Sequence, residues 1–284
     1  MSLLRKLVYP ELVTLVGWAE QEGWEPGHHD AEQFWNYDPA GFLAIEEDGE
    51  FLGGGAIIKH SDQFGFMGLF IVSPERRGRG LGTRLWNARR DTLLERLGDS
   101  ATIGLDGVDA MVPFYAKGGF VQATRHRRFR YQGSDIPSMA DHHHVSLQDV
   151  PENDLARYDR QCFPAERLRF VRQWSQQNSA TSLASYPDGN LQGFGVIRRC
   201  TSGWRVGPLF ADDVAVANDL FDSLLVGTKG LPVFIDVPDA NQEGIHWVQQ
   251  RGMEEVFGCE RMYYGKAPEI DHSKIFGVST LEIG

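Results

Sequence analysis

The sequence lacks any long apolar run. No stretch approaches the roughly 18 uninterrupted apolar residues that a membrane-spanning helix needs, and the N-terminal segment passes into acidic, amphipathic sequence without a signal-peptide pattern. Cysteine is also scarce, and the 3 cysteines among 284 residues are too scattered for a disulfide framework or a zinc site. These absences predict a soluble, unprocessed protein of the reducing cytoplasm, with no membrane partner and no metal.

Basic residues are also fewer than acidic ones. The chain carries 28 lysines and arginines against 39 aspartates and glutamates, a net charge of -11, and neither half of it is basic. A protein of this charge repels the phosphate backbone of nucleic acids at long range and attracts cationic small molecules. We therefore expect no nucleic-acid partner, although acidity of this size can also serve solubility alone.

The remaining composition is typical of a folded globular protein, with 42% hydrophobic and 24% charged residues. The length allows one large domain or two of ordinary size. The densest cluster of turn-forming residues after the first hundred spans 133–141, which is typical of a linker. This pattern predicts two domains, residues 1–135 and residues 136–284.

The two halves resemble one another weakly. Three short segments of the first half recur in the second, in the same order and at similar spacing, which predicts a duplicated fold. The paired segments are 52–58 with 192–198, 67–70 with 206–210, and 105–110 with 235–240.

Hydrophobic periodicity and turn residues indicate the elements of the first half. Helices are predicted over 11–20, 82–97 and 111–116, and strands over 41–46, 51–58, 65–72, 101–105 and 120–131. The first two strands flank a turn at Glu47, Asp48 and Gly49 and are expected to form a hairpin. Together these elements predict an α/β fold, a mixed sheet with helices on its faces.

The most informative stretch is 69–83, which follows a predicted strand and opens a predicted helix. Its glycines at 78, 80 and 82 carry no Cβ, so several backbone N–H groups can turn toward one point. The positive end of the helix dipole lies at the same place, which makes a cradle suited to a pyrophosphate. The loop lacks the Gly-Lys-Ser/Thr ending of a Walker loop and the spacing of a Rossmann turn.

This loop resembles the acyl-CoA loop of the GCN5-related N-acetyltransferases (GNAT), whose pattern Gln/Arg-x-x-Gly-x-Gly/Ala is matched by Arg77, Gly80 and Gly82. A second motif of that family follows in order at 114–120, which reads FYAKGGF. The resemblance covers roughly residues 40–131. It implies a mixed, mostly antiparallel sheet flanked by helices, and acetyl-CoA as cosubstrate.

The resemblance also implies roles for single residues. In the family, the strand before the loop splays from its neighbour and pairs with the pantetheine, the loop amides hold the pyrophosphate, and a tyrosine faces the thioester sulfur. Tyr115 matches that tyrosine and is expected to be the general acid, since a phenol with a pKa of about 10 can protonate the leaving thiolate. The residues expected to bind the cofactor are Phe70, Ile71, Val72, Arg77, Gly78, Arg79, Gly80, Leu81, Gly82 and Thr83.

The proton acceptor is harder to assign. Many family members carry a glutamate on the strand before the loop, but residues 66–70 supply no carboxylate. Asp106 and Asp109 lie at the end of the next strand and could serve, and Asp106 is the candidate base. The alternatives are that it caps the helix at 111–116, that a water relays the proton, or that the amine loses its proton in solution.

The acceptor pocket is expected between the segment 22–35 and a face of the second half. Trp24, Asp30 and Phe34 belong to this segment, where aromatic rings and carboxylates suit a cationic amine. Phe163 and Arg167 are expected to form the facing wall, because pockets favour domain interfaces. The alternatives are that Asp30 caps a helix with Phe34 in the core, and that the second domain only stabilises the first or mediates a homodimer.

The second half is predicted to have lost the cofactor loop. Residues 210–217 contain no glycine, and Asp212 and Asp213 would repel a pyrophosphate. Val248 stands at the position that corresponds to Tyr115. The layout is similar to bacterial acetyltransferases with a degenerate C-terminal acetyltransferase-like domain. It implies an acetyl-CoA-dependent N-acetyltransferase that acts on a primary amine of a small molecule or peptide in a ternary complex, and the alternative is a non-catalytic acyl-CoA-binding regulator.

Overall fold

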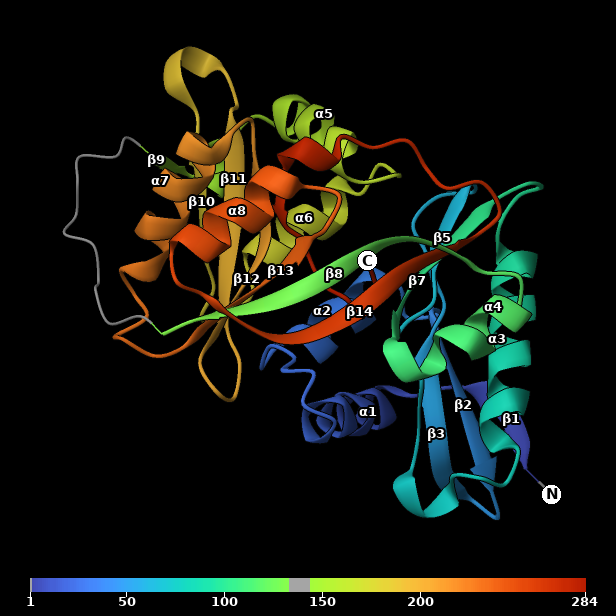
Figure 1. Cartoon of the computed structure of the whole chain (residues 1–284). Helices are drawn as coiled ribbons and strands as arrows, with labels where there is room; N and C mark the ends of the chain where they lie inside the picture. The colour runs from blue at the N-terminus through green and yellow to red at the C-terminus, as the bar shows by residue number, and fades with distance from the viewer. Residues whose placement is uncertain (1, 133–143) are drawn as a thin grey trace.

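The computed structural model describes residues 2–132 and 144–284. The linker predicted at 133–141 lies outside these residues, so the division of the chain at residue 135 stays a prediction. Figure 1 shows two assemblies of sheet and helices side by side, the first half of the chain on the right and most of the second on the left. Among the described residues, no helix is long and apolar enough to cross a membrane.

The first half contains the elements that its periodicity predicts. The hairpin turn at Asp48 and Gly49 has positive φ at both residues, 52° and 81°, a geometry that suits glycine at the second position. The helices are α1 (Tyr9–Gln21), α2 (Asp30–Tyr37), α3 (Leu81–Arg96) and α4 (Val112–Lys117). The strands are β1 (Leu3–Lys6), β2 (Phe42–Glu47), β3 (Glu50–Ala56), β4 (Ile58–Lys59), β5 (Phe64–Phe66), β6 (Ile71–Val72), β7 (Thr102–Val108) and β8 (Val121–Tyr131).

The segment predicted as one strand over 65–72 is two strands that belong to different sheets. β5 pairs in parallel with β7, whereas β6 pairs antiparallel with β3 at the edge of a four-stranded sheet of order β1-β2-β3-β6. Leu69 lies at the crossing with a φ of 47°, in the left-handed region that non-glycine residues rarely adopt. β6 and β7 therefore diverge, and a gap opens between these two strands.

A buried arginine supports this crossing. Arg89 of α3 donates from Nη2 to the carbonyl oxygens of Ala56 (2.7 Å) and Gly68 (2.6 Å), which lie where the chain passes from one sheet to the other. Gly55 leaves room for it, since a Cβ there would come within 2.4 Å of the Arg89 Nε. The guanidinium thus adds donors at the carbonyl groups of the crossing, where the Gly68 oxygen also accepts from the Ala56 amide at 2.8 Å.

The second half repeats the order of elements. Its helices are α5 (Glu152–Cys162), α6 (Leu168–Ser175), α7 (Val214–Leu225) and α8 (Gln242–Gln250). Its strands are β9 (His144–Ser146), β10 (Thr181–Ser185), β11 (Gly193–Arg199), β12 (Trp204–Ala211), β13 (Val233–Pro238), β14 (Glu254–Tyr264) and β15 (Ile275–Gly277). The segments that echo one another in sequence fall on β3 and β11, and on β7 and β13.

The two halves exchange their long strands. β14 of the second half lies between β7 and β8, and β8 of the first half lies between β14 and β13. The large sheet therefore has the order β4-β5-β7-β14-β8-β13-β12-β11-β10-β9, with β15 on β12. In Figure 1 the two long ribbons of β8 and β14 run side by side across the middle of the molecule. Because of this exchange, neither half completes its sheet from its own sequence.

Buried ion pairs add to the contact between the halves. Arg128 of β8 binds Asp236 of β13 through Nε (2.7 Å) and Nη2 (3.1 Å), and Arg205 of β12 binds the same carboxylate at 2.6 Å. All three side chains are buried. Loss of one partner of such a pair typically costs about 3–5 kcal/mol, because the other charge stays buried without compensation.

Candidate active site

A cavity of about 460 Å³ opens where β6 splays from β7. It is bounded by the glycine loop and α3 on one side, by the end of α1 on another, and by β14 and the C-terminal segment on the third. The residues that line it are Glu22, Trp24, Met67, Gly68, Leu69, Phe70, Ile71, Val72, Arg77, Gly78, Gly82, Trp86, Arg89, Leu105, Asp106, Val108, Met111, Tyr115, Phe257, Cys259, Leu281 and Glu282.

One end of the cavity is the glycine loop. Gly78 and Gly80 have positive φ, 76° and 77°, and Gly80 precedes the first residue of α3 with no side-chain cap. The first N–H groups of this 16-residue helix therefore lack intrahelical partners and, with the helix dipole, favour an anion. Of the expected cofactor residues, Arg77, Gly78 and Gly82 line the cavity, while Arg79, Gly80, Leu81 and Thr83 lie in the same loop and first helical turn.

The strand β6 forms the wall that follows this loop. Phe70, Ile71 and Val72 all line the cavity. Within the described part of the chain, β6 has β3 as its only strand partner, so its other edge faces the splay. A strand edge of this kind offers main-chain groups to an extended ligand.

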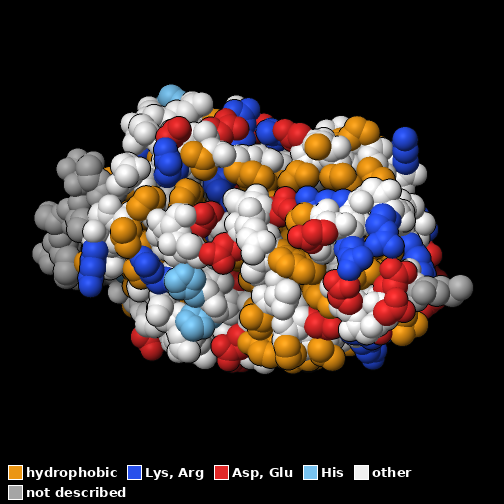
Figure 2. All heavy atoms as spheres, turned by 90° about the horizontal axis from the view of Figure 1, so that it is seen from below, with side chains coloured by type: hydrophobic (Ala, Val, Ile, Leu, Met, Phe, Trp, Pro, Cys, Tyr) orange, Lys and Arg blue, Asp and Glu red, His pale blue; other side chains and the backbone are white. Residues whose placement is uncertain are grey.

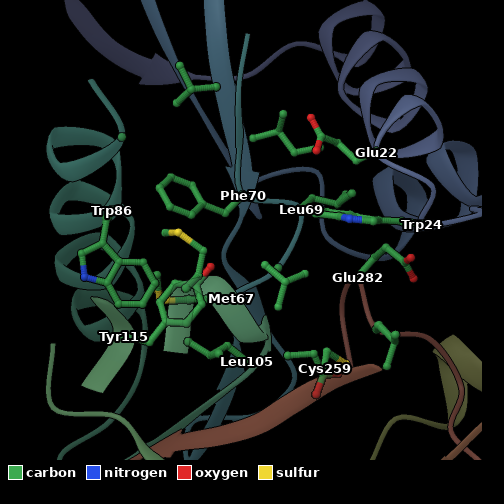
Figure 3. A pocket seen from close by; sticks show the side chains of 18 of the residues that line it. Glu22, Trp24, Met67, Leu69, Phe70, Trp86, Leu105, Tyr115, Cys259 and Glu282 are labelled. Carbon is green, nitrogen blue, oxygen red and sulfur yellow. The ribbon is translucent and has the colours of Figure 1, made fainter. Parts of the chain in front are cut away.

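Tyr115 of α4 reaches the middle of the cavity. Its ring packs against Trp86 at 4.9 Å between centroids and lies over Gly107, where a Cβ would come within 2.6 Å of the ring. Figure 3 shows its hydroxyl directed into the cavity, beside Met67 and opposite Trp24. Burial raises the pKa of Tyr115 to about 12, so the phenol keeps its proton throughout the neutral range.

Arg89 places a buried positive charge at the wall of the cavity near Tyr115. Burial lowers the pKa of its guanidinium to about 9, which still leaves it charged at neutral pH. Its Nε and Nη1 have no hydrogen-bond partner among the residues that the structure describes, and its carbon Cζ lies 5.0 Å from the centre of the Phe70 ring. The positive charge close to Tyr115 favours negative charge in this part of the cavity.

The second half supplies part of the opposite wall. Phe257 and Cys259 come from β14, and Leu281 and Glu282 come from the C-terminal segment. That segment lies so close to the crossing that a Cβ on Gly68 would come within 1.9 Å of the Glu282 carbonyl oxygen. The Glu282 carboxylate accepts from Arg205 (3.3 Å) and from the Thr280 hydroxyl. No pattern in the sequence marks these four residues, because their place depends on the strand exchange.

Of the acceptor residues expected in the segment 22–35, only Trp24 lines the cavity. Asp30 is fully buried and binds Arg198 of β11 through both carboxylate oxygens (2.9 and 3.1 Å) and the Gly27 amide (2.8 Å). Phe34 is also fully buried and stacks on Trp174 at 5.9 Å. The expectation for these two residues is corrected, because their side chains are used in packing between the halves.

Phe163 and Arg167 also lie away from the cavity. Arg167 binds Asp159 through two nitrogens (3.0 Å each) and donates to the Gly284 main-chain oxygen at 3.1 Å. The Phe163 ring lies 3.6 Å from the Arg167 guanidinium carbon. The expectation that they form the acceptor wall is corrected: Arg167 instead fixes the C-terminal segment, which carries Leu281 and Glu282 to the cavity.

Asp106 lines the cavity, but its carboxylate is already bound by an arginine. Arg261 of β14 binds both of its carboxylate oxygens (2.7 and 2.8 Å), and the charges of Arg261 and His126 lower the pKa of Asp106 to about 2 despite burial. A carboxylate with this pKa is a weak proton acceptor at neutral pH. The alternative role in capping is not seen either, since α4 has no side-chain cap.

Asp106, His126 and Cys259 form a cluster of metal-ligand type, with one ligand atom of each within 4.8 Å of the others. Burial, followed by the charge of Asp106, raises the pKa of the Cys259 thiol well above its usual value. Arg261 already neutralises the carboxylate. A cation here would have to displace Arg261 and deprotonate a buried thiol, which makes the donor set unfavourable for a metal.

The sequence model of the acetyltransferase (GNAT) family matches residues 9–120, and that of an acetyltransferase (GNAT) domain matches residues 155–277. One match falls in each half, and each contains the repeated order of strands and helices. The chain belongs to the GNAT acetyltransferases. It is a tandem GNAT acyltransferase, and the predicted mixed α/β fold is confirmed.

Several known proteins resemble this GNAT chain along most of its length. The holothin acyltransferase of a Pseudoalteromonas species (strain SANK 73390) is 29% identical, over 94% of this chain and 89% of that protein. A candidate acetyltransferase from Pyrococcus horikoshii has the same fold, with a TM-score of 0.83 at 22% identity over 100% of this chain and 96% of the other. A tandem GNAT protein from the clavulanic acid biosynthesis pathway gives a TM-score of 0.65 at 13% identity, over 94% and 99% of the two chains.

The second GNAT unit differs from the first where a cofactor loop would lie. The Asp213 carboxylate caps α7 by accepting from the Val216 amide at 3.0 Å, so it occupies the helix end that an anion would need. Asp212 accepts from the Tyr158 hydroxyl (2.8 Å) and from Lys274 (2.9 Å). Val248 is fully buried in α8. These contacts favour acyl-CoA binding by the first unit, as the sequence predicts.

Proposed function

We propose that this GNAT acyltransferase transfers the acetyl group of acetyl-CoA to a primary amine of a small molecule or peptide. Proteins of this family generally use acetyl-CoA. The observation that carries the proposal is that one cavity is lined by the glycine loop, by Tyr115 and by Trp24 at the end of α1. A donor thioester held by the loop and β6 and an amine held beside Trp24 would meet at Tyr115.

Acetyl-CoA supplies an activated acyl group that an amine can accept with release of the CoA thiol. The loop amides and the N-terminus of α3 would hold its pyrophosphate, and the edge of β6 would align its pantetheine. Tyr115 would give its proton to the departing sulfur, because its raised pKa keeps that proton available at neutral pH. The buried charge of Arg89 would stabilise negative charge that develops on the donor side.

The acceptor side suits a cation, since the exposed Glu22 carboxylate and the Trp24 indole lie on the same side of the cavity. Asp106 is not proposed as the base. The proton of the amine would leave to solvent or to an exposed carboxylate before attack.

The proposal is tested by measuring thiol release from acetyl-CoA with a panel of primary amines. We expect thiol release that depends on the amine and saturates with it. The same panel with hexanoyl-CoA tests a longer donor, which the apolar side chains of Met67, Leu69 and Leu105 in the cavity would admit. CoA binding without thiol release for any amine and donor would contradict the proposal and favour a regulatory acyl-CoA-binding protein.

Gly80→Asp is expected to abolish CoA binding while the protein stays folded. The new carboxylate would stand at the N-terminus of α3 and repel the pyrophosphate. No atom of residues 2–132 or 144–284 outside the adjacent backbone lies within 4 Å of the Cβ position to force unfolding. Isothermal titration with CoA measures the loss.

Gly189→Asp is the matched control, because Gly189 has a similar φ of 76° and equally open surroundings but does not line the cavity. It should bind CoA like the wild type. Unchanged CoA affinity in Gly80→Asp would contradict the placement of the pyrophosphate.

A further inference from the structure

An ion pair at the wall of the cavity joins the glycine loop to the C-terminal end of α1. The Arg77 Nη2 binds the Glu22 carboxylate, while the Arg77 Nε donates to the Val72 carbonyl oxygen at 3.0 Å. Arg77 belongs to the glycine loop, and Glu22 is the residue at the C-terminal end of α1. Both line the cavity, so their contact connects the proposed donor site to the proposed acceptor site.

Glu22 differs from the other two carboxylates of the cavity. Both oxygens of Asp106 are bound by Arg261, and the Glu282 carboxylate is held by Arg205 and Thr280. These two side chains are 1% and 2% exposed, whereas the Glu22 side chain is 34% exposed. In Figure 3 the Glu22 carboxylate stands on the same side of the cavity as Trp24, opposite Trp86 and Tyr115.

Arg77, the partner of Glu22, is more exposed than the arginines that bind the other two carboxylates, so a ligand can compete for it more easily. The Arg77 side chain is 48% exposed and stands beside the amides of the glycine loop. A pyrophosphate in that loop carries more negative charge than one carboxylate and offers guanidinium groups several acceptor oxygens. Arg77 would therefore turn from Glu22 toward the bound pyrophosphate.

We propose that Glu22 binds the ammonium group of the acceptor and that it becomes free to do so when the donor draws Arg77 away. This inference rests on the proposed function. The freed carboxylate and the neighbouring Trp24 ring together provide an ion-pair partner and a ring face for the cation. Without donor, Arg77 neutralises Glu22 and the acceptor site lacks its negative charge. Seen from below the view of Figure 1, the surface shows basic and acidic side chains intermingled, with no broad area of one sign (Figure 2).

This coupling predicts that one substitution strengthens CoA binding and weakens amine binding. Glu22→Gln removes the competitor for Arg77, so CoA should bind about two- to five-fold more tightly, the range expected for an exposed ion pair. It also removes the ammonium partner, so the KM of the amine should rise about 10-fold or more while kcat changes less.

Glu50→Gln is the matched control. Glu50 pairs with the adjacent loop arginine, Arg76, at 2.6 Å, but it does not line the cavity. The experiment titrates CoA into the wild type and both variants and then measures KM and kcat for the amine with the fastest turnover in the panel. Glu50→Gln should stay within about two-fold of the wild type in both measurements.

The outcomes separate this inference from the proposed function. If the wild type binds no CoA or turns over no amine, the proposed function fails, and the inference fails with it. If the wild type is active but Glu22→Gln matches Glu50→Gln in CoA affinity, the competition for Arg77 is refuted. If CoA binding tightens in Glu22→Gln while the KM of the amine stays unchanged, the acceptor role of Glu22 is refuted.

Discussion

Residues 1–135 produced alone are expected to give neither a stably folded protein nor an acyltransferase. This fragment keeps β8 but lacks β13 and β14, which are its two partners in the sheet. β7 would lose β14 as well, and Arg128 would stay buried without Asp236 or become exposed. Unpaired strands with apolar faces tend to aggregate. The fragment would also lack Phe257, Cys259, Leu281 and Glu282 from the cavity wall.

Circular dichroism, thermal unfolding and CoA titration of the purified fragment check this expectation. Co-expression of residues 1–135 with residues 136–284 is the control, since the break then falls among residues 133–143, outside the strands that are exchanged. The pair should assemble and bind CoA. A fragment that unfolds cooperatively on its own and binds CoA as tightly as the full chain would contradict the role given to β14.

Tyr115→Phe is expected to lower kcat by about 10²-fold, the range for loss of a general acid, with little change in CoA affinity. The ring and its packing on Trp86 are kept, and only the hydroxyl in the cavity is removed. Because the pKa of Tyr115 is about 12, its titration should not appear in the rate profile of the wild type between pH 6 and pH 9. The rate should instead rise with pH as the amine acceptor loses its proton.

Steady-state kinetics across this pH range provide the measurement. Tyr264→Phe is the control, because Tyr264 of β14 packs on Phe120 at 5.8 Å and does not line the cavity. It should keep nearly the full rate. If Tyr115→Phe also keeps its rate, the thiolate takes its proton from solvent.

The donor side of the site could be predicted from the sequence because its signals are local. Three glycines at alternate positions between a strand and a helix determine the loop, and Tyr115 follows in a contiguous motif. The break between β5 and β6 was missed, since apolar residues continue through the crossing at 65–72. The Arg89 guanidinium, which binds the carbonyl groups at this crossing, comes from a helix further along the chain.

The acceptor side depends on contacts between segments that are distant in sequence. Hydrophobic periodicity predicts where strands lie but not which strands pair with one another. Asp30 lies in a segment with the composition expected of an acceptor site. Its carboxylate instead binds Arg198, 168 positions away, in the interior of the protein. Arg167 is likewise paired with Asp159. Phe257 reaches the cavity because β14 joins the sheet of the first half, and Glu282 reaches it on the C-terminal segment, which Arg167 binds through the Gly284 oxygen.

A crystal structure with bound CoA tests the central claim most directly. The account predicts the pyrophosphate at the amides of residues 77–83, the pantetheine along β6, and the sulfur within hydrogen-bond distance of the Tyr115 hydroxyl. It also predicts that Arg77 contacts phosphate in place of Glu22. CoA bound in the second half, or with its sulfur remote from Tyr115, would contradict the account.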